Sequence, residues 1–479
     1  MYYRLKEPYA FRGWKKLPYA ICALKGPKLF DRPIFFEKEI FMDMLYFNGQ
    51  EAVDPAAFSE KLQTVIKEMC QNDMLESSED VMPPLQPWQR YHVYPSRHIE
   101  SVHWSITGKC NFKCRHCLLS APTACHPQLS FENCLKIMDE LARCGIHQVD
   151  ITGGEPLVRR DYEEFFKELA KRGIFIRVFF TNASLLDEAV LDTLEKYGHR
   201  PSFQFSFDGL GHHDWLRGVE GAEKQADAAF RLLKERGYPC VAAMCIHKGN
   251  KDSLAATVEY LHDMGVRGLR VNSPQELGIW KEYSEEYALS QDEVWALYRD
   301  YIPKYFEAGM PIGLDLDGYF SCKGGETQYR VPYAHSMENV ENFERQYLCE
   351  SLRRVVHISA EGRLVPCMGF CGTALEDKFP SLLEEPLGKL TLDSFYEEVA
   401  SSRMEDLMAN DPECATCPHL RSCCGGCMVD GVTPDGKYAH RSKLSCYFHK
   451  HIGAEAVRAV VDAAIKKYCS TEEKSDEQI

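Results

Sequence analysis

The stretch HWSITGKCNFKCRHC, residues 103–117, is the part of the sequence that most narrows the fold. Its first five residues, 103–107, form a candidate strand, and Cys110, Cys114 and Cys117 follow with C-x3-C-x2-C spacing. Three thiolates on one short loop after a strand can bind three irons of a [4Fe–4S] cluster and leave the fourth iron without a protein ligand. An open iron is a place for substrate chemistry, whereas four protein ligands favour simple electron storage.

Cysteine usage over the whole chain also points to metal. The sequence holds 21 cysteines, and in a long chain without an export signal such thiols are metal ligands more often than disulfides. The alternatives at the triplet are buried thiols or a zinc site in which His116 or Cys125 supplies the fourth ligand. Cys134 and Cys144 fall at helical positions and are expected to be small core residues.

Around the triplet, residues 100–275 alternate between candidate strands and helices. The candidate strands are His103–Thr107, Gln148–Thr152, Ile174–Thr181, Ser202–Phe207, Cys240–His247 and Gly268–Asn272. The helical stretches between them end at Gly145, Gly173, Gly198, Gly237 and Gly265. Glycine at such a place supplies the left-handed residue that closes a helix. Six strand–helix units predict an α/β fold, a parallel partial barrel of TIM-like type, with function at the carboxyl ends of the strands.

The N-terminal region has a different pattern. Residues 17–24 and the stretch ending at Leu29-Phe30 flank Lys25-Gly26-Pro27, which is a hairpin signal. One helix is expected from Glu37 to Phe47 and a second from Asp54-Pro55 onward. The buried stripe expected on the second helix consists of Phe58, Leu62, Val65 and Met69. This order of elements predicts a winged-helix-like module that ends at the linker Pro83–Pro87.

Charge and hydropathy exclude several classes of protein. The formal net charge of −15 argues against binding nucleic acid through its phosphates. No uncharged apolar run reaches the ~18 residues that would cross a membrane. The start, residues 1–7, lacks the apolar segment of a signal peptide. We therefore expect a cytoplasmic enzyme with no nucleic-acid or membrane partner.

Five segments are expected along the chain. Residues 1–97 would form the winged-helix-like module, 98–300 the partial barrel and 301–348 a bridging region. Residues 349–450 would form a cysteine-rich domain organised by bound metal, because regular periodicity fades there. Residues 451–479 would form a last amphipathic helix, about 454 to 468, and a polar disordered tail.

The cysteine loop resembles the cluster loop of the radical S-adenosylmethionine (radical SAM) superfamily, with His116 at a position usually held by an aromatic residue. In that family the open iron binds S-adenosylmethionine, and one-electron cleavage gives a 5′-deoxyadenosyl radical that abstracts a substrate hydrogen. Three further segments resemble family motifs: Thr152–Pro156, Thr181–Ala183 and Ser206–Gly209 with Arg217 downstream. The cofactor contacts that this resemblance implies are His116, Gly153, Gly154, Glu155, Asn182, Ser206, Asp208 and Arg217. The plainer alternatives are turn capping for Ser206 and a surface ion pair for Arg217.

The C-terminal cysteines resemble the seven-cysteine SPASM pattern, which carries two auxiliary [4Fe–4S] clusters, so the resemblance implies three clusters in all. By the same resemblance, the ligands of the first auxiliary cluster are Cys349, Cys367 and Cys427. Those of the second auxiliary cluster are Cys414, Cys417, Cys423 and Cys446. A zinc ribbon is the competing interpretation for Cys414 and Cys417.

Seven ligands leave the first auxiliary cluster one short. Cys322 is the upstream candidate for the eighth ligand, and an open iron that binds substrate is the alternative. Cys371 and Cys424 fall outside the pattern and could compete as ligands.

The N-terminal module bears on the substrate. A winged helix that reads DNA needs a basic recognition helix, and the predicted helix 54–70 offers only Lys61 and Lys67. The module resembles the leader-peptide recognition element of ribosomal-peptide (RiPP) maturation enzymes, which binds a leader peptide as an added strand. The resemblance therefore implies a precursor peptide as partner and an external electron donor of flavodoxin or ferredoxin type.

The expected function is that of a radical SAM/SPASM oxidoreductase that installs a cross-link, thioether or C–C/C–O, in a precursor peptide. The auxiliary clusters could accept the second electron as such a bond closes. A peptide epimerase stays open, with Cys245 or Cys240 as a possible thiol hydrogen donor, although core thiols explain both cysteines more simply. An anaerobic sulfatase-type maturase and an iron–sulfur redox-sensing regulator stay open as well.

Overall fold

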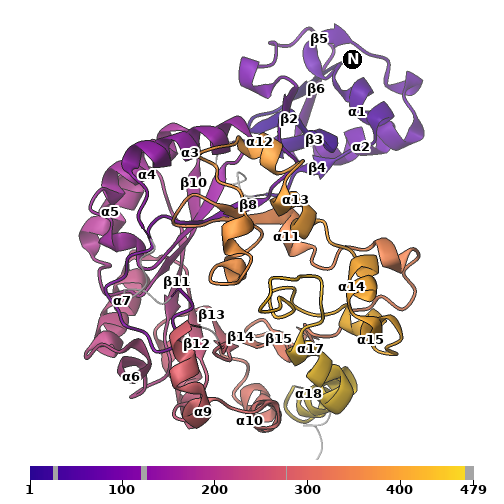
Figure 1. Cartoon of the computed structure of the whole chain (residues 1–479). Helices are drawn as coiled ribbons and strands as arrows, with labels where there is room; N and C mark the ends of the chain where they lie inside the picture. Colours follow the sequence, from indigo (N-terminus) through magenta and orange to yellow (C-terminus); the bar gives the residue numbers. More distant parts are fainter. Residues whose placement is uncertain (25–30, 120–126, 277, 470–479) are drawn as a thin grey trace, which may run out of the picture.

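The computed structural model describes residues 1–24, 31–119, 127–276 and 278–469. The N-terminal module contains two small sheets (Figure 1). One has the order β5 (Asn48–Ala52), β1 (Tyr2–Leu5), β6 (Leu75–Ser78). The other has the order β4 (Ile34–Phe35), β3 (Leu17–Ala23), β2 (Tyr9–Trp14), β7 (His92–Tyr94). Helices α1 (Lys38–Met44) and α2 (Glu60–Gln71) complete the module, which has its own core around Phe11, Phe41 and Phe47.

The second helix begins later than the sequence pattern predicted. Asp54 accepts a hydrogen bond from the amide of Ala56, but it caps only a short 3-10 turn, Pro55–Ala57. Ser59 is the N-cap of α2 and accepts from the amide of Leu62. The predicted buried stripe was therefore wrong at two positions. Phe58 precedes the helix, and Ile66 takes the buried place expected for Val65, so that the buried residues are Leu62, Ile66 and Met69.

The predicted hairpin turn, Lys25-Gly26-Pro27, lies outside the described residues, as do Cys125 and the tail 470–479. On either side of the first gap, β3 and β4 pair antiparallel. The sequence pattern did not predict the β2–β3 hairpin. Its tight turn depends on Gly13, where an added Cβ would lie 2.0 Å from the carbonyl oxygen of Pro18.

The barrel sheet follows the predicted alternation. Its first strands are β8 (Ser101–Ser105), β9 (Gln148–Thr152), β10 (Phe175–Thr181), β11 (Ser202–Ser206), β12 (Cys240–Cys245) and β13 (Gly268–Asn272). Two more parallel strands, β14 (Gly313–Leu316) and β17 (Val355–Ile358), pair with β13 and β8. Antiparallel β15 (Phe320–Cys322), β16 (Tyr329–Arg330) and β18 (Leu364–Val365) occupy the two ends of the sheet order. Among the described residues the sheet thus runs from β16 to β18 as an open barrel, which confirms the predicted α/β partial barrel.

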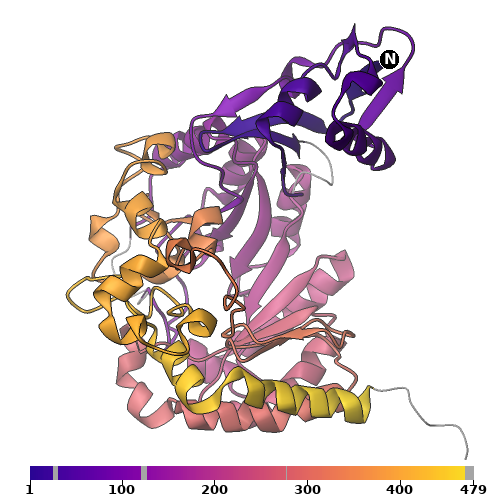
Figure 2. The same cartoon turned by 90° about the vertical axis from the view of Figure 1, so that its right-hand side faces the viewer.

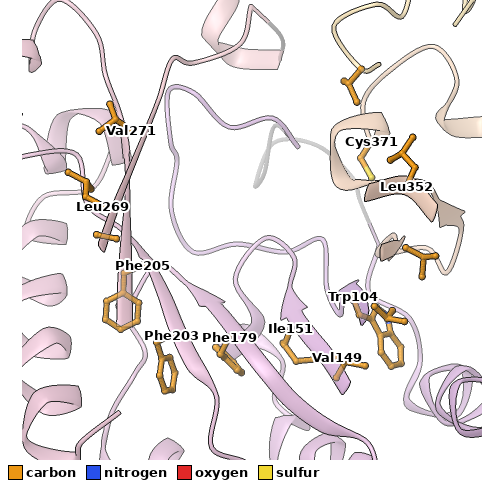
Figure 3. Packing of buried hydrophobic residues seen from close by; sticks show 14 of the residues in the cluster. Trp104, Val149, Ile151, Phe179, Phe203, Phe205, Leu269, Val271, Leu352 and Cys371 are labelled. Atoms are coloured by element: carbon orange, nitrogen blue, oxygen red, sulfur yellow. The ribbon is translucent and has the colours of Figure 1, made fainter. Parts of the chain in front are cut away.

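Helices cover the convex face of this sheet (Figure 1). They include α3 (Phe131–Arg143), α4 (Tyr162–Lys171), α5 (Glu188–Lys196), α6 (His213–Arg217), α7 (Ala222–Arg236) and α8 (Leu254–Asp263). The predicted closing glycines 145, 173, 198, 237 and 265 all have positive φ, as a left-handed helix end requires. Figure 3 shows buried strand residues such as Val149, Phe179 and Phe205 in the core. Because side chains alternate along a strand, the neighbouring residues of each strand face the barrel interior.

The C-terminal region packs on the open side of the barrel and shares its core. Its helices are α9 (Ser284–Tyr287), α10 (Gln291–Glu307), α11 (Ser351–Arg354), α12 (Leu387–Leu390), α13 (Phe395–Ala400), α14 (Met404–Asn410), α15 (Pro412–Ala415), α16 (Leu420–Cys423), α17 (Lys443–Tyr447) and α18 (Ala454–Tyr468). Helix α18 packs against α10 (Figure 2). The expected domain boundaries stay predictions, although the parallel sheet draws strands from beyond residue 300. Within the described ranges, no helix is long and apolar enough to cross a membrane.

Candidate functional site

The three loop cysteines open onto one cavity at the carboxyl ends of β9, β10 and β11. This cavity, of about 280 Å³, is lined by Cys110, Cys114 and Cys117. Among the other predicted contacts, His116, Gly153, Gly154, Asn182, Ser206 and Arg217 line it as well. Burial raises the pKa of Cys110 to about 12, and the neighbouring thiols add to the shift. Such a thiol binds metal by releasing its proton, so this donor set fits a cluster held by three cysteines.

Gly153 and Gly154 run directly against the start of the cysteine loop. An added Cβ would lie 2.3 Å from the carbonyl oxygen of Thr107 at Gly153, and 2.3 Å from that of Lys109 at Gly154. The amide of Gly154 donates to Thr107 O (2.9 Å), and the amide of Glu155 donates to Lys109 O (2.8 Å). The two segments therefore form one wall of the cavity, and only glycine allows this distance.

Glu155 is fully buried and has no place among the cavity-lining residues. Its carboxylate accepts from Thr181 Oγ1 (2.9 Å), the amide of Asn182 (2.7 Å) and the amide of Leu157 (3.1 Å). Burial raises its pKa to about 7, although these donors favour the charged form. In this structure Glu155 ties the end of β9 to the end of β10, and its contact with the cofactor stays a prediction.

Asn182 follows β10 and reaches back to the cysteine loop. Its Nδ2 lies 3.9 Å from Cys110 Sγ and donates to Asn111 Oδ1 at 2.8 Å. The amide of Phe112 also donates to Cys110 Sγ, at 3.4 Å. Two N–H groups thus point at one loop thiol.

Asp208 does not line the cavity either, but it holds a residue that does. Its side chain is fully buried, and it accepts from Arg217 Nε (2.7 Å) and Nη2 (3.1 Å). Burial opposes its ionisation, but Arg217 and His213, whose Nδ1 lies 3.0 Å from Asp208 Oδ2, together outweigh that effect and hold the pKa of Asp208 well below its usual range. The surface ion pair considered for Arg217 is therefore wrong, because the Arg217 side chain is only 7% exposed.

His116 lies at the cavity wall between two loop cysteines. Its buried Nδ1 has no hydrogen-bond partner among the described residues. Burial lowers its pKa to about 3, so the ring is neutral. Arg115 is not among the cavity-lining residues, and its guanidinium lies 4.7 Å from the centre of the Trp215 ring.

The two cysteines of β12 face opposite sides of the sheet. Cys240 is 3% exposed and belongs to the core cluster under the helices. Cys245, five residues later, is half-buried, faces the barrel interior and donates its amide to Asp208 Oδ1 (3.0 Å). Of the two predicted thiols, only Cys245 is on the cavity side of the sheet.

A second group of cysteines converges in the C-terminal region. Cys414, Cys417, Cys423 and Cys446, the four residues expected to act together, line one small cavity. Burial raises the pKa of Cys423 to about 11, with Cys446 and Cys417 adding to the shift. The predicted ligand set is thus brought together by three short segments of chain.

Cys349, Cys367 and Cys427 are also neighbours. Burial raises the pKa of Cys367 to about 12, and the charges of Cys427 and Cys349 act in the same direction. The segments that carry Cys367 and Cys427 touch at Gly369, where a Cβ would lie 2.9 Å from Val429 Cγ2.

The remaining candidate thiols have other surroundings. Cys322 sits on β15, where its thiol donates to the carbonyl oxygen of Glu326 (3.0 Å), and the structure does not bring it to the group around Cys367. Cys371 is buried close to Cys367. Cys424 caps α16 with a φ of 52°. No group of three or more His, Cys, Asp or Glu side chains in the described chain is arranged to hold a single metal ion.

Six residues that line the cavity were not predicted from the sequence: Phe112, Leu118, Leu119, Phe180, Gln204 and Met368. Gln204 precedes Ser206 by two residues on β11, so strand alternation was a usable signal for it. Met368 follows Cys367 and comes from the C-terminal region, and no local pattern links it to the barrel.

The sequence and the fold of this chain are similar to those of known proteins, and the matched region includes the cysteine loop and the strands around the cavity. Residues 104–261 match the family model described as Radical SAM superfamily. The PqqA peptide cyclase of Granulibacter bethesdensis is 27% identical over 375 residues, covering 75% of this chain and 90% of that protein. The subtilosin biosynthesis protein AlbA of Bacillus subtilis is 24% identical over 362 residues, covering 74% and 72%. Among solved structures, Streptococcus suis SuiB bound to precursor peptide SuiA superposes with a TM-score of 0.63 at 15% identity, covering 92% of this chain and 99% of that one.

Proposed function

We propose that this chain, an enzyme with a radical SAM domain at residues 104–261, matures a ribosomally synthesised precursor peptide by installing an oxidative cross-link, thioether or C–C/C–O. The observation that carries the proposal is the single cavity in which three loop thiols meet the glycine pair, Asn182, Ser206 and Arg217. The similarity to a peptide cyclase and to a bacteriocin biosynthesis protein supports a peptide as the substrate.

Within the site, Cys110, Cys114 and Cys117 would hold the [4Fe–4S] cluster. The glycine pair, Asn182, Ser206 and Arg217 would surround S-adenosylmethionine, and Glu155 and Asp208 would hold Asn182 and Arg217 in place. When bound, the cluster and S-adenosylmethionine supply a 5′-deoxyadenosyl radical that removes a hydrogen atom from the substrate.

The C-terminal thiols would hold two further [4Fe–4S] clusters, which makes three. Cys414, Cys417, Cys423 and Cys446 would ligate one of them. Cys349, Cys367 and Cys427 would ligate the other, and an open iron there is favoured over Cys322 because Cys322 has different neighbours. Electrons would come from a flavodoxin or ferredoxin in the cytoplasm.

The N-terminal module would hold the leader of the precursor. Strand β4 is the edge of its sheet, and Ile34 and Phe35 on that strand are 45% and 40% exposed. Met42 and Tyr46, on or just after α1, are 45% and 49% exposed. A strand that ends its sheet among the described residues and carries exposed apolar side chains suits a peptide that binds as an added strand.

Co-expression with the short open reading frames beside the gene, followed by mass spectrometry, tests the proposal. We expect one of these peptides to lose two hydrogens per cross-link. The same peptide should stay unmodified when the Cys114→Ala variant is expressed in place of the parent enzyme. An unchanged peptide mass together with no 5′-deoxyadenosine under reducing conditions would contradict the proposal and favour a non-catalytic iron–sulfur regulator. Formylglycine formation on a folded protein would support the sulfatase-type alternative.

The position of Cys245 favours peptide epimerisation as a second candidate function. Cys245 is a protonated, half-buried thiol on the cavity side of β12, since burial raises its pKa to about 12. Such a thiol can return a hydrogen atom to a peptide radical, which is the requirement for epimerisation. A peptide with altered stereochemistry and unchanged mass, lost in Cys245→Ala, would establish that function.

A further inference from the structure

Two polar side chains from outside the cysteine loop point at its thiols. Arg217 Nη1 lies 3.8 Å from Cys114 Sγ, and Asn182 Nδ2 lies 3.9 Å from Cys110 Sγ. Of these two, Arg217 carries a charge, and that charge is almost completely shielded from water. A buried cation next to a metal-binding sulfur has a strong electrostatic effect because little water screens it.

The direction of the guanidinium is set by Asp208. Nε and Nη2 of Arg217 both donate to the Asp208 carboxylate, at 2.7 and 3.1 Å, which leaves Nη1 for Cys114. Asp208 is itself held, since its Oδ1 also accepts from the amide of Cys245 (3.0 Å). A bidentate pair of this kind fixes both the position and the plane of the guanidinium.

The backbone independently brings Arg217 to the loop. Arg217 ends α6, and an added Cβ on the next residue, Gly218, would lie 2.4 Å from the carbonyl oxygen of Lys113. The amide of Arg115 donates to Leu216 O at 2.9 Å. The end of α6 is therefore in direct contact with the residues on both sides of Cys114.

We infer that Arg217 tunes the reduction potential of the cluster that Cys110, Cys114 and Cys117 would hold, with Asp208 as its counter-charge. The inference rests on the proposed function only in requiring that cluster. Reduction adds one electron, and hydrogen bonds and positive charge at the cluster sulfurs stabilise the reduced form. Arg217 raises the potential and Asp208 lowers it, so the pair sets how readily the cluster accepts an electron. Arg217 is in this role a positioned charge on a ligand and takes no part in bond making.

The two members of the pair predict shifts of opposite sign. Arg217→Met removes the cation and leaves the Asp208 carboxylate, so the midpoint potential should fall. Asp208→Asn removes the counter-charge and should raise it. Arg217→Lys keeps the positive charge, so its midpoint potential should stay close to that of the parent. Lys113→Met is the matched control, because it removes one positive charge from the same loop at a solvent-exposed position where water and salt screen it.

The measurement is a redox titration of the full chain, reconstituted with iron and sulfide and followed by electron paramagnetic resonance. The signal that changes when S-adenosylmethionine is added identifies this cluster among others. We expect the ratio of reduced to oxidised cluster at a fixed potential to drop at least tenfold in Arg217→Met, a shift of about 59 mV for one electron. Iron content and the absorption spectrum show that each variant carries its clusters.

Equal potentials in the parent, Arg217→Met and Asp208→Asn would overturn the inference, as would shifts of the same sign in both variants. If Arg217→Met does not retain its cluster, the rise in Asp208→Asn and the unchanged potential in Arg217→Lys decide the question. The absence of any signal sensitive to S-adenosylmethionine in the parent chain would instead contradict the proposed function.

Discussion

At the scale of single residues, Gly154 leaves no room for a side chain, because an added Cβ would lie 2.3 Å from the carbonyl oxygen of Lys109. Gly154→Ala would force these backbones apart, at a cost of about 1–3 kcal/mol, and would displace the residue before Cys110. We expect the variant to lose bound iron and 5′-deoxyadenosine formation. Gly173→Ala is the control, because no atom lies within 4 Å of its added Cβ and it meets only the backbone strain of a positive φ. Full iron content in Gly154→Ala would show that the contact is dispensable.

Glu155 gives a pH-dependent prediction at the same scale. Burial raises its pKa from 4.5 to about 7, so the folded chain keeps a proton that the unfolded chain has released. The stability contributed by this proton is present below pH 4.5 and is lost as pH rises to about 7. In urea unfolding between pH 4.5 and about pH 7, the parent should lose stability relative to Glu155→Gln, which cannot titrate there. If the difference in the free energy of unfolding between the two proteins is constant across that range, the raised pKa of Glu155 is refuted.

The sequence could predict those candidate-site residues that belong to a recognisable motif. The loop cysteines, which cysteine spacing singled out, line one cavity with the glycine pair, Ser206 and Arg217, which the resemblance to family motifs implied. The partners of Glu155 and Asp208 could not be predicted. Their roles depend on which backbone amides and side chains three-dimensional packing brings to a buried carboxylate.

At the scale of elements, α2 shows where sequence periodicity is ambiguous. The buried stripe of the structure predicts that Ile66→Ala destabilises the N-terminal module by about 2–4 kcal/mol, because Ile66 is 7% exposed in its core. The neighbouring Val65→Ala should cost about 1 kcal/mol or less, since Val65 is only half-buried. Thermal unfolding of both variants checks this, and a larger loss in Val65→Ala would favour the stripe predicted from the sequence.

The six barrel strands were predicted within two residues, because five of them follow a helix-closing glycine and β8 directly precedes the cysteine loop. Strands β14 and β17 were missed for a different reason. They are only four residues long and lie beyond the six predicted units, and their place in the sheet comes from pairing with β13 and β8. Local patterns carry no information about such distant partners.

At the scale of the whole molecule, the barrel and the cysteine-rich region share a core, whereas the N-terminal module has its own. A chain that starts at residue 95, just after β7, should therefore stay folded and should keep its iron and its uncoupled 5′-deoxyadenosine formation. A chain that stops at residue 348 should aggregate, because it lacks β17 and exposes the edge of β8. Size-exclusion chromatography and iron analysis of the two truncations test this. A soluble, monomeric 1–348 chain would show that β17 is not needed.

The pairing of β17 with β8 also has a consequence for how the chain folds during synthesis. About 250 residues separate the two strands, so β8 leaves the ribosome well before its neighbour exists. At ~5–20 residues per second this delay is on the order of ten seconds or more. During that interval β8 and the thiols that follow it are exposed to aggregation and oxidation. Productive expression should therefore depend on chaperone capacity and on a reducing, low-oxygen cell more strongly than the stability of the finished protein suggests.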